Sequence, residues 1–84
     1  MLTVYSKANC PFCDRAKDLL KNKNIEFTEV RVDLVPAARE FLVNSGHRSV
    51  PQIYAGDKLF VDGGFQGLQQ LTETQLREKL NAIT

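Results

Sequence analysis

Cys10 and Cys13 are the two cysteines of the chain, and they stand three positions apart. A thiolate in such a pair can attack a disulfide, after which the second thiol attacks the first sulfur and releases the reduced target. A bridge between them closes too short a loop to restrict the unfolded chain much, so a structural disulfide is a poor explanation. The spacing indicates redox chemistry, with metal binding and two inert packed thiols as the alternatives.

The remaining residue types weaken the metal alternative. A tetrahedral zinc site takes four ligands, and His47 is the one histidine that could join the cysteines. We therefore expect no metal. His47 could also act as a base, but a solvated loop histidine is the simpler interpretation.

The cysteine pair stands at the start of a predicted helix. Pro11 suits the first helical position, where its missing N–H would have no partner, and apolar residues follow at helical spacing up to Asn22. The dipole and unpaired N–H groups at this end should lower the pKa of Cys10 below the ~8.5 of a free cysteine, and Lys7 adds a nearby positive charge. We expect Cys10 to lie at the surface as the nucleophile, and Cys13 to resolve the mixed disulfide.

The apolar pattern predicts the elements that hold this pair. Strands are expected at 2–6, 25–32, 51–54 and 58–61, and helices at 11–22, 33–45 and 68–83. The order β-α-β-α-β-β-α predicts an α/β fold, in which a parallel strand pair and a hairpin form one sheet covered by helices. Thr72 followed by Gln75 resembles a capping box, which leaves open a division of the last helix near residues 72–74.

Composition limits the other function classes. The 84 residues suffice for one domain, 1–84, and 11 Lys and Arg are interspersed with 10 Asp and Glu, so no basic stripe indicates nucleic-acid binding. No apolar run approaches the ~20 residues that cross a bilayer, and the start lacks the features of a secretion signal. We expect a cytoplasmic protein that binds neither nucleic acid nor membrane. A monomer is expected, since no long exposed apolar stripe is evident.

Three motifs together resemble those of the glutaredoxins. Cys10-Pro11-Phe12-Cys13 resembles the dithiol motif Cys-Pro-Tyr-Cys, Ser49-Val50-Pro51 resembles Thr-Val-Pro, and Gly63-Gly64 resembles the glycine pair before the last helix. The resemblance runs the length of the chain and implies a thioredoxin fold, with a four-stranded mixed sheet flanked by three helices. It also implies that Pro51 is cis and faces the cysteine pair, so that Val50 can pair with an extended ligand as a strand edge does.

The resemblance implies a thiol–disulfide oxidoreductase that reduces protein disulfides and glutathione mixed disulfides, with glutathione as the reductant. Lys7 and Arg39 would then meet the glycine carboxylate of glutathione, and Val50 its cysteinyl backbone. For Arg39 a solvated surface charge is the alternative. The implied groove residues are Lys7, Pro11, Phe12, Arg39, Ser49, Val50, Pro51, Gly63, Gly64, Phe65 and Gln66.

Two features resemble a neighbouring class. Gln66 and Gly67 stand where many glutaredoxins have an acidic residue for the γ-glutamyl ammonium, and a neutral Gln lacks the charge-assisted part of that contact. Asp33-Leu34-Val35-Pro36 and the compact length resemble the glutaredoxin-like redoxins, which thioredoxin reductase reduces. Thioredoxin reductase is therefore the alternative electron donor. Ribonucleotide reductase is the family-level expectation for a protein target, because such reductases need a dithiol donor.

An iron–sulfur binding module is the alternative from another class. Cys10 together with glutathione could ligate a cluster across a dimer. The motif Cys-Gly-Phe-Ser of the monothiol glutaredoxins that carry such clusters is absent, because Pro11 and Cys13 replace its Gly and Ser. The dithiol motif favours the oxidoreductase.

Overall fold

The computed structural model describes residues 2–83. Its elements follow the predicted order, with the second strand and second helix shorter than expected. They are β1 (Leu2–Ser6), α1 (Pro11–Asn22), β2 (Phe27–Arg31), α2 (Pro36–Asn44), β3 (Gln52–Ala55), β4 (Lys58–Val61), α3 (Gly64–Gln70) and α4 (Glu73–Ala82). Within these residues, no helix is long and apolar enough to cross a membrane.

The helices number four rather than the three that we expected, because the last one divides. Thr72 forms a capping box at the start of α4: its Oγ1 accepts from the Gln75 N–H at 3.1 Å, and the Gln75 Oε1 accepts from the Thr72 N–H at 3.0 Å. These contacts satisfy donors that a helix start leaves unpaired, so α4 begins afresh after α3.

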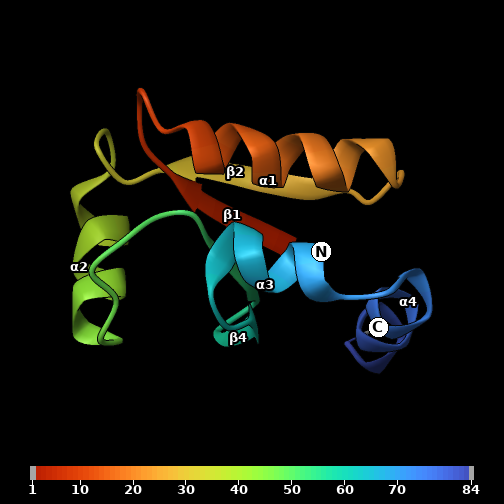
Figure 1. Ribbon diagram of the computed structural model, residues 1–84. Coiled ribbons are helices and arrows are strands. Elements are labelled where there is room, and N and C mark those ends of the chain that lie inside the picture. The colour runs from red at the N-terminus through yellow and green to blue at the C-terminus, as the bar shows by residue number, and fades with distance from the viewer. Residues whose placement is uncertain (1, 84) are drawn as a thin grey trace.

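The four strands form one mixed sheet in the order β2-β1-β3-β4. β1 runs parallel to β2 and antiparallel to β3, which pairs with β4 as the predicted hairpin. In Figure 1, α1 and α3 lie together on one side of the sheet, whereas α2 stands apart from them. The cysteine loop begins at the carboxyl end of β1, so the cysteine pair lies at the edge of the sheet where β1 ends.

Side chains on the two faces of β1 pack in different layers. Leu2, Val4 and Ser6 are buried beneath α1, while Tyr5 packs on Phe41 of α2, with ring centroids 5.7 Å apart. The buried core beneath α1 comprises Leu2, Val4, Ala16, Leu20, Ile25, Ile53, Phe60, Val61, Leu68 and Leu76. Burial of these residues fixes α1 on the sheet and thereby fixes the position of its N-terminus.

Candidate functional site

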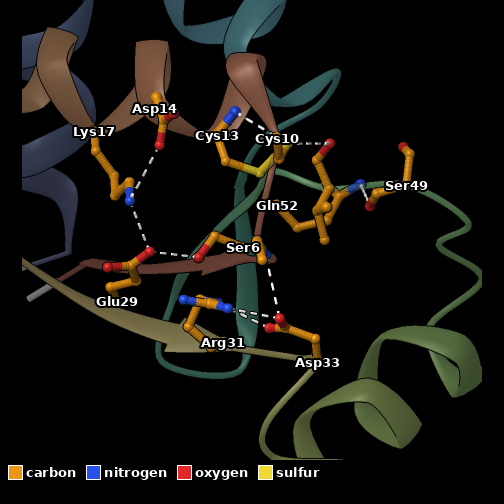
Figure 2. Close-up of a disulfide and its surroundings, with 12 residues drawn as sticks. Ser6, Cys10, Cys13, Asp14, Lys17, Glu29, Arg31, Asp33, Ser49 and Gln52 are labelled. Atoms are coloured by element: carbon orange, nitrogen blue, oxygen red, sulfur yellow. Dashed lines mark hydrogen bonds and ion pairs between the residues drawn. A yellow bond between two sulfur atoms is a disulfide. The ribbon is translucent and has the colours of Figure 1, made fainter.

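Cys10 is the N-cap of α1, and Pro11 is the first helical residue. The Cys13 N–H donates to the Cys10 Sγ at 3.2 Å, and the Asp14 N–H donates to the Cys10 carbonyl at 3.1 Å. A disulfide joins Cys10 to Cys13, with their Cα atoms 5.2 Å apart (Figure 2). When the disulfide is reduced, the same N–H donor and the helix dipole favour the thiolate at Cys10.

Burial of the two cysteines differs from our expectation. We expected Cys10 at the surface, but its exposed fraction is 8%, against 0% for Cys13. As the N-cap, Cys10 turns its sulfur back over the helix start toward Cys13, and the carbonyl of Val50 lies 3.8 Å from it. Cys10 is the cysteine that keeps some exposed surface, whereas Cys13 is fully covered, so Cys10 is the candidate for attack on an incoming disulfide.

The Val50–Pro51 corner lies against the cysteine pair, and its peptide bond is cis, as the resemblance implied. The Gln52 side chain stabilises the corner, because its amide donates to the Ser49 carbonyl at 2.9 Å (Figure 2). Among residues 2–83, no hydrogen bond uses the Val50 N–H. That donor is free to pair with an extended ligand beside Cys10.

Gly64 brings the third motif to the same corner. Its φ is +58°, and a Cβ there would lie 2.5 Å from the Pro51 carbonyl oxygen. Only a glycine allows so close an approach in this backbone conformation. The start of α3 therefore packs directly against the Val50–Pro51 corner.

Two grooves flank the corner. The first, which we call the cationic groove, has a volume of about 360 Å³, and its lining includes the cations Lys7, Arg39 and Arg48 and the apolar residues Leu42 and Val43. None of its three cations forms an ion pair among the residues described. The groove therefore offers uncompensated positive charge to an anionic ligand.

The second groove, which we call the aromatic groove, has a volume of about 590 Å³. Phe12 and Phe65 form one wall, with ring centroids 6.1 Å apart, and the Arg15 guanidinium lies 5.3 Å from the Phe12 centroid. Both grooves share Ser49 and Val50. A ligand paired with Val50 would thus reach the cationic groove on one side and the aromatic groove on the other.

Comparison with known proteins decides the family. Residues 2–61 match the glutaredoxin family model. This chain belongs to the glutaredoxin family. Its solved structural neighbours include glutaredoxins and a thioredoxin-like protein, which confirms the predicted thioredoxin fold.

Curated relatives include two kinds of small redox protein. Glutaredoxin 3 of Escherichia coli (strain K12) is 44% identical over 52 residues, which cover 61% of this chain and 63% of that protein, a little under two thirds of its length. The glutaredoxin-like protein NrdH of Salmonella typhimurium (strain LT2) is 39% identical over 56 residues, which cover 67% of this chain and 69% of that protein. Among solved structures, a buckwheat glutaredoxin–glutathione complex is similar with a TM-score of 0.73 and 26% identity, covering 98% of this chain and 77% of that one.

This glutaredoxin-family chain gathers most of the predicted site residues around one disulfide. Lys7 and Arg39 line the cationic groove, and Ser49 and Val50 line both grooves. Pro11 lines neither groove and acts as the first residue of α1. The predicted residues that line the aromatic groove are Phe12, Ser49, Val50, Pro51, Gly63, Gly64, Phe65 and Gln66.

Sequence reasoning missed several residues that line the grooves, and three of them carry polar or charged side chains of interest. Arg48 lines both grooves, Asp62 lines the aromatic groove, and His47 is half-buried rather than solvated. The Nε2 of His47 shares a hydrogen bond of 2.6 Å with the hydroxyl of Tyr54. The adjacency of Arg48 to the Ser49-Val50-Pro51 motif was the one local signal for any of them.

Asp33 connects the loop before Cys10 to the end of β2 through hydrogen bonds to its carboxylate. Arg31 donates to both carboxylate oxygens of Asp33, at 2.8 and 2.6 Å, and the Ala8 N–H donates to Oδ2 at 3.2 Å. The Arg31 guanidinium is the main reason that the pKa of Asp33 falls to about 2. Although Asp33 lines the cationic groove, its charge is compensated by Arg31.

A second polar network lies between α1 and the sheet (Figure 2). The buried Ser6 hydroxyl donates to Glu29 Oε2 at 2.6 Å, and Lys17 Nζ donates to the same oxygen at 2.8 Å. The hydrogen bond from Lys17 is the main cause that lowers the pKa of Glu29, and the same bond raises the pKa of Lys17. These hydrogen bonds connect α1 to β1 and β2 below the disulfide.

Within residues 2–83, no group of three or more His, Cys, Asp or Glu side chains is arranged to hold a metal ion.

Proposed function

We propose that this protein is a thiol–disulfide oxidoreductase that reduces protein disulfides and glutathione mixed disulfides with electrons from glutathione. The observation that carries the proposal is the Cys10–Cys13 disulfide at the N-terminus of α1, beside the unpaired N–H of Val50 and between two grooves. A cytoplasmic location fits this chemistry, because glutathione keeps thiols reduced there.

With a glutathione mixed disulfide, the Cys10 thiolate attacks the sulfur of the glutathionyl group. The target leaves as a thiolate that takes up a proton, and Cys10 becomes joined to glutathione. A second glutathione thiolate then attacks the glutathionyl sulfur, which releases glutathione disulfide and restores the Cys10 thiolate. The Cys13 N–H, 3.2 Å from the Cys10 sulfur, stabilises that thiolate both as nucleophile and as leaving group.

With a protein disulfide, both cysteines of the chain take part. Cys10 attacks one sulfur of the target, and Cys13 then attacks the Cys10 sulfur, so that the target leaves with two thiols and Cys10–Cys13 becomes a disulfide. Two glutathione molecules return the pair to the dithiol and become glutathione disulfide. The target segment would pair with the Val50 N–H as an added strand.

Charge in the cationic groove supports glutathione as the donor. Lys7, Arg39 and Arg48 have no ion-pair partner among the described residues, and a glycine carboxylate extending from Cys10 past Val50 would meet them. The similarity to a solved glutaredoxin–glutathione complex points the same way.

A second candidate keeps the chemistry and takes its electrons from thioredoxin reductase. The 39% identity to the glutaredoxin-like protein NrdH and the neutral residues Gln66 and Gly67 favour it. Ribonucleotide reductase is the protein target that we propose for either donor, because that enzyme needs a dithiol reductant.

Two coupled assays separate the candidates. NADPH oxidation is followed with glutathione and glutathione reductase in one assay and with thioredoxin reductase in the other, using the same glutathionylated peptide or protein disulfide. We expect turnover in the first assay and its loss in the Cys10→Ser variant. Turnover with thioredoxin reductase alone would overturn glutathione as the donor, and full activity of Cys10→Ser would overturn the mechanism.

A further inference from the structure

His47 and Tyr54 stand on either side of the Val50–Pro51 corner in the sequence, and their side chains meet in the structure. The His47 Nε2 shares a hydrogen bond of 2.6 Å with the Tyr54 hydroxyl, and the two rings lie at 89° to each other, with centroids 5.7 Å apart. His47 is half-buried and lines both grooves, whereas Tyr54 is 4% exposed and lines neither. A ligand in either groove therefore meets His47 and not the Tyr54 hydroxyl.

Packing fixes the position of the Tyr54 ring. Tyr54 lies in β3 opposite Thr3 of β1, so the sheet register sets its backbone. The centroid of its ring lies 5.2 Å from that of Phe41 in α2 and 5.6 Å from that of Tyr5, with both pairs in edge-to-face geometry. Close packing of this kind leaves a buried ring little freedom to move. The sheet and α2 thus determine where the hydroxyl lies, and His47 binds to that fixed point.

The loop that carries Val50 lacks such support. Residues 45–50 belong to no helix or strand, so individual hydrogen bonds must hold them in place. The His47 N–H donates to the Leu42 carbonyl near the end of α2 at 2.9 Å, and the His47 ring binds Tyr54 in β3. His47 is thus attached to two elements, three positions before the Val50 N–H that we propose to pair with a ligand.

We infer that Tyr54 is a positioning residue, whose hydrogen bond to His47 holds the loop so that the Val50 N–H can pair with the backbone of a disulfide-bearing peptide. This inference rests on the proposed function, since it concerns how the same site recognises the polypeptide around a disulfide. The Tyr54 hydroxyl contributes to recognition of peptide groups and not to the reactivity of Cys10. A disulfide without peptide groups makes no use of the Val50 N–H, so its reduction does not depend on Tyr54.

The test compares two disulfides, using pre-reduced full-length protein in a single turnover with no recycling reductant. One is a peptide carrying a glutathionyl group, and the other is bis(2-hydroxyethyl) disulfide, which has no peptide group. We expect Tyr54→Phe to slow reduction of the peptide about fivefold, the effect of one hydrogen bond, and to leave reduction of the hydroxyethyl disulfide unchanged.

Tyr5→Phe is the matched control, because it removes a hydroxyl from the same ring cluster. Among residues 2–83, the Tyr5 hydroxyl forms no hydrogen bond. This variant should reduce both disulfides like the wild type.

His47→Ala removes the other partner of the hydrogen bond. Because Tyr54 acts through His47, the double variant Tyr54→Phe/His47→Ala should reduce the peptide no more slowly than His47→Ala alone. The inference is overturned if Tyr54→Phe slows both disulfides equally or slows neither, or if the two single effects multiply in the double variant. A wild-type protein that reduces neither disulfide would instead overturn the proposed function itself.

Discussion

The Cys13 N–H donates to the sulfur of Cys10 at 3.2 Å, so the residue that we propose as the resolving thiol also contacts the sulfur that it would attack. The contact exists because Cys10 occupies the N-cap, where a side chain ordinarily accepts from the backbone one turn later. Once the disulfide is reduced, the donors of the helix start favour the anion of a sulfur in this position without a separate base.

The first prediction concerns the two cysteines. Cys13→Ser should retain reduction of glutathione mixed disulfides and lose reduction of intramolecular protein disulfides, because only the second reaction needs a resolving thiol. In this variant the remaining thiol of Cys10 should ionise below the ~8.5 of a free cysteine, as followed by thiolate absorbance against pH. Ionisation like that of a free cysteine would contradict stabilisation by the helix.

The second prediction concerns Gly64. Gly64→Ala should lower the free energy of unfolding by about 1 kcal/mol for its positive φ and by about 2 kcal/mol more for the overlap with the Pro51 carbonyl. Gly56→Ala is the control, since its φ of +64° is similar but nothing lies within 4 Å of the added Cβ. Denaturant unfolding measures the free energy of unfolding of both variants. Equal decreases in the two variants would show that the overlap with the Pro51 carbonyl adds no destabilisation.

The third prediction concerns the network beneath α1. Ser6→Ala should lower the free energy of unfolding by about 1 kcal/mol, because it removes a buried hydroxyl that donates to the Glu29 carboxylate. Ser45→Ala, at an exposed position after α2, should change it by less than about 0.5 kcal/mol. Chemical denaturation measures the free energy of unfolding of both variants. Equal values for Ser6→Ala and Ser45→Ala would show that the Ser6 hydroxyl does not stabilise the fold.

The fourth prediction concerns acid. The pKa of Asp33 lies at about 2, below its ordinary value of 3.8, so its ionised form is favoured in the folded chain. The stability that this adds is present above pH 3.8 and is lost as the pH falls toward about 2. Asp33→Asn should therefore be less stable than the wild type near neutral pH, and the two proteins should converge in acid.

Urea unfolding over a pH series measures this convergence. Asp57→Asn, in the exposed hairpin turn, should stay parallel to the wild type throughout. A constant difference between Asp33→Asn and the wild type down to pH 2 would show that the Arg31 contact does not act through the Asp33 charge.

Features that depend on neighbours in the chain could be predicted from the sequence alone. Pro11 marks the first residue of α1, Thr72 with Gln75 marks the start of α4, and residues 55–57 mark the hairpin turn. Each rests on backbone propensity or on contacts within one turn, which a short window of sequence contains. The thiolate-favouring place of Cys10 belongs to the same group.

Contacts between distant segments were decided only by the tertiary structure. Val50 lies 40 positions from Cys10, yet its carbonyl helps to cover the sulfur that we expected at the surface. His47 forms a hydrogen bond with Tyr54, and the backbone of Asp62 lies beside Gly67. Both contacts depend on the sheet register and on the close packing of α3. Periodicity tells which face of an element is buried, but not which residues of two elements meet, because that depends on how the whole core packs.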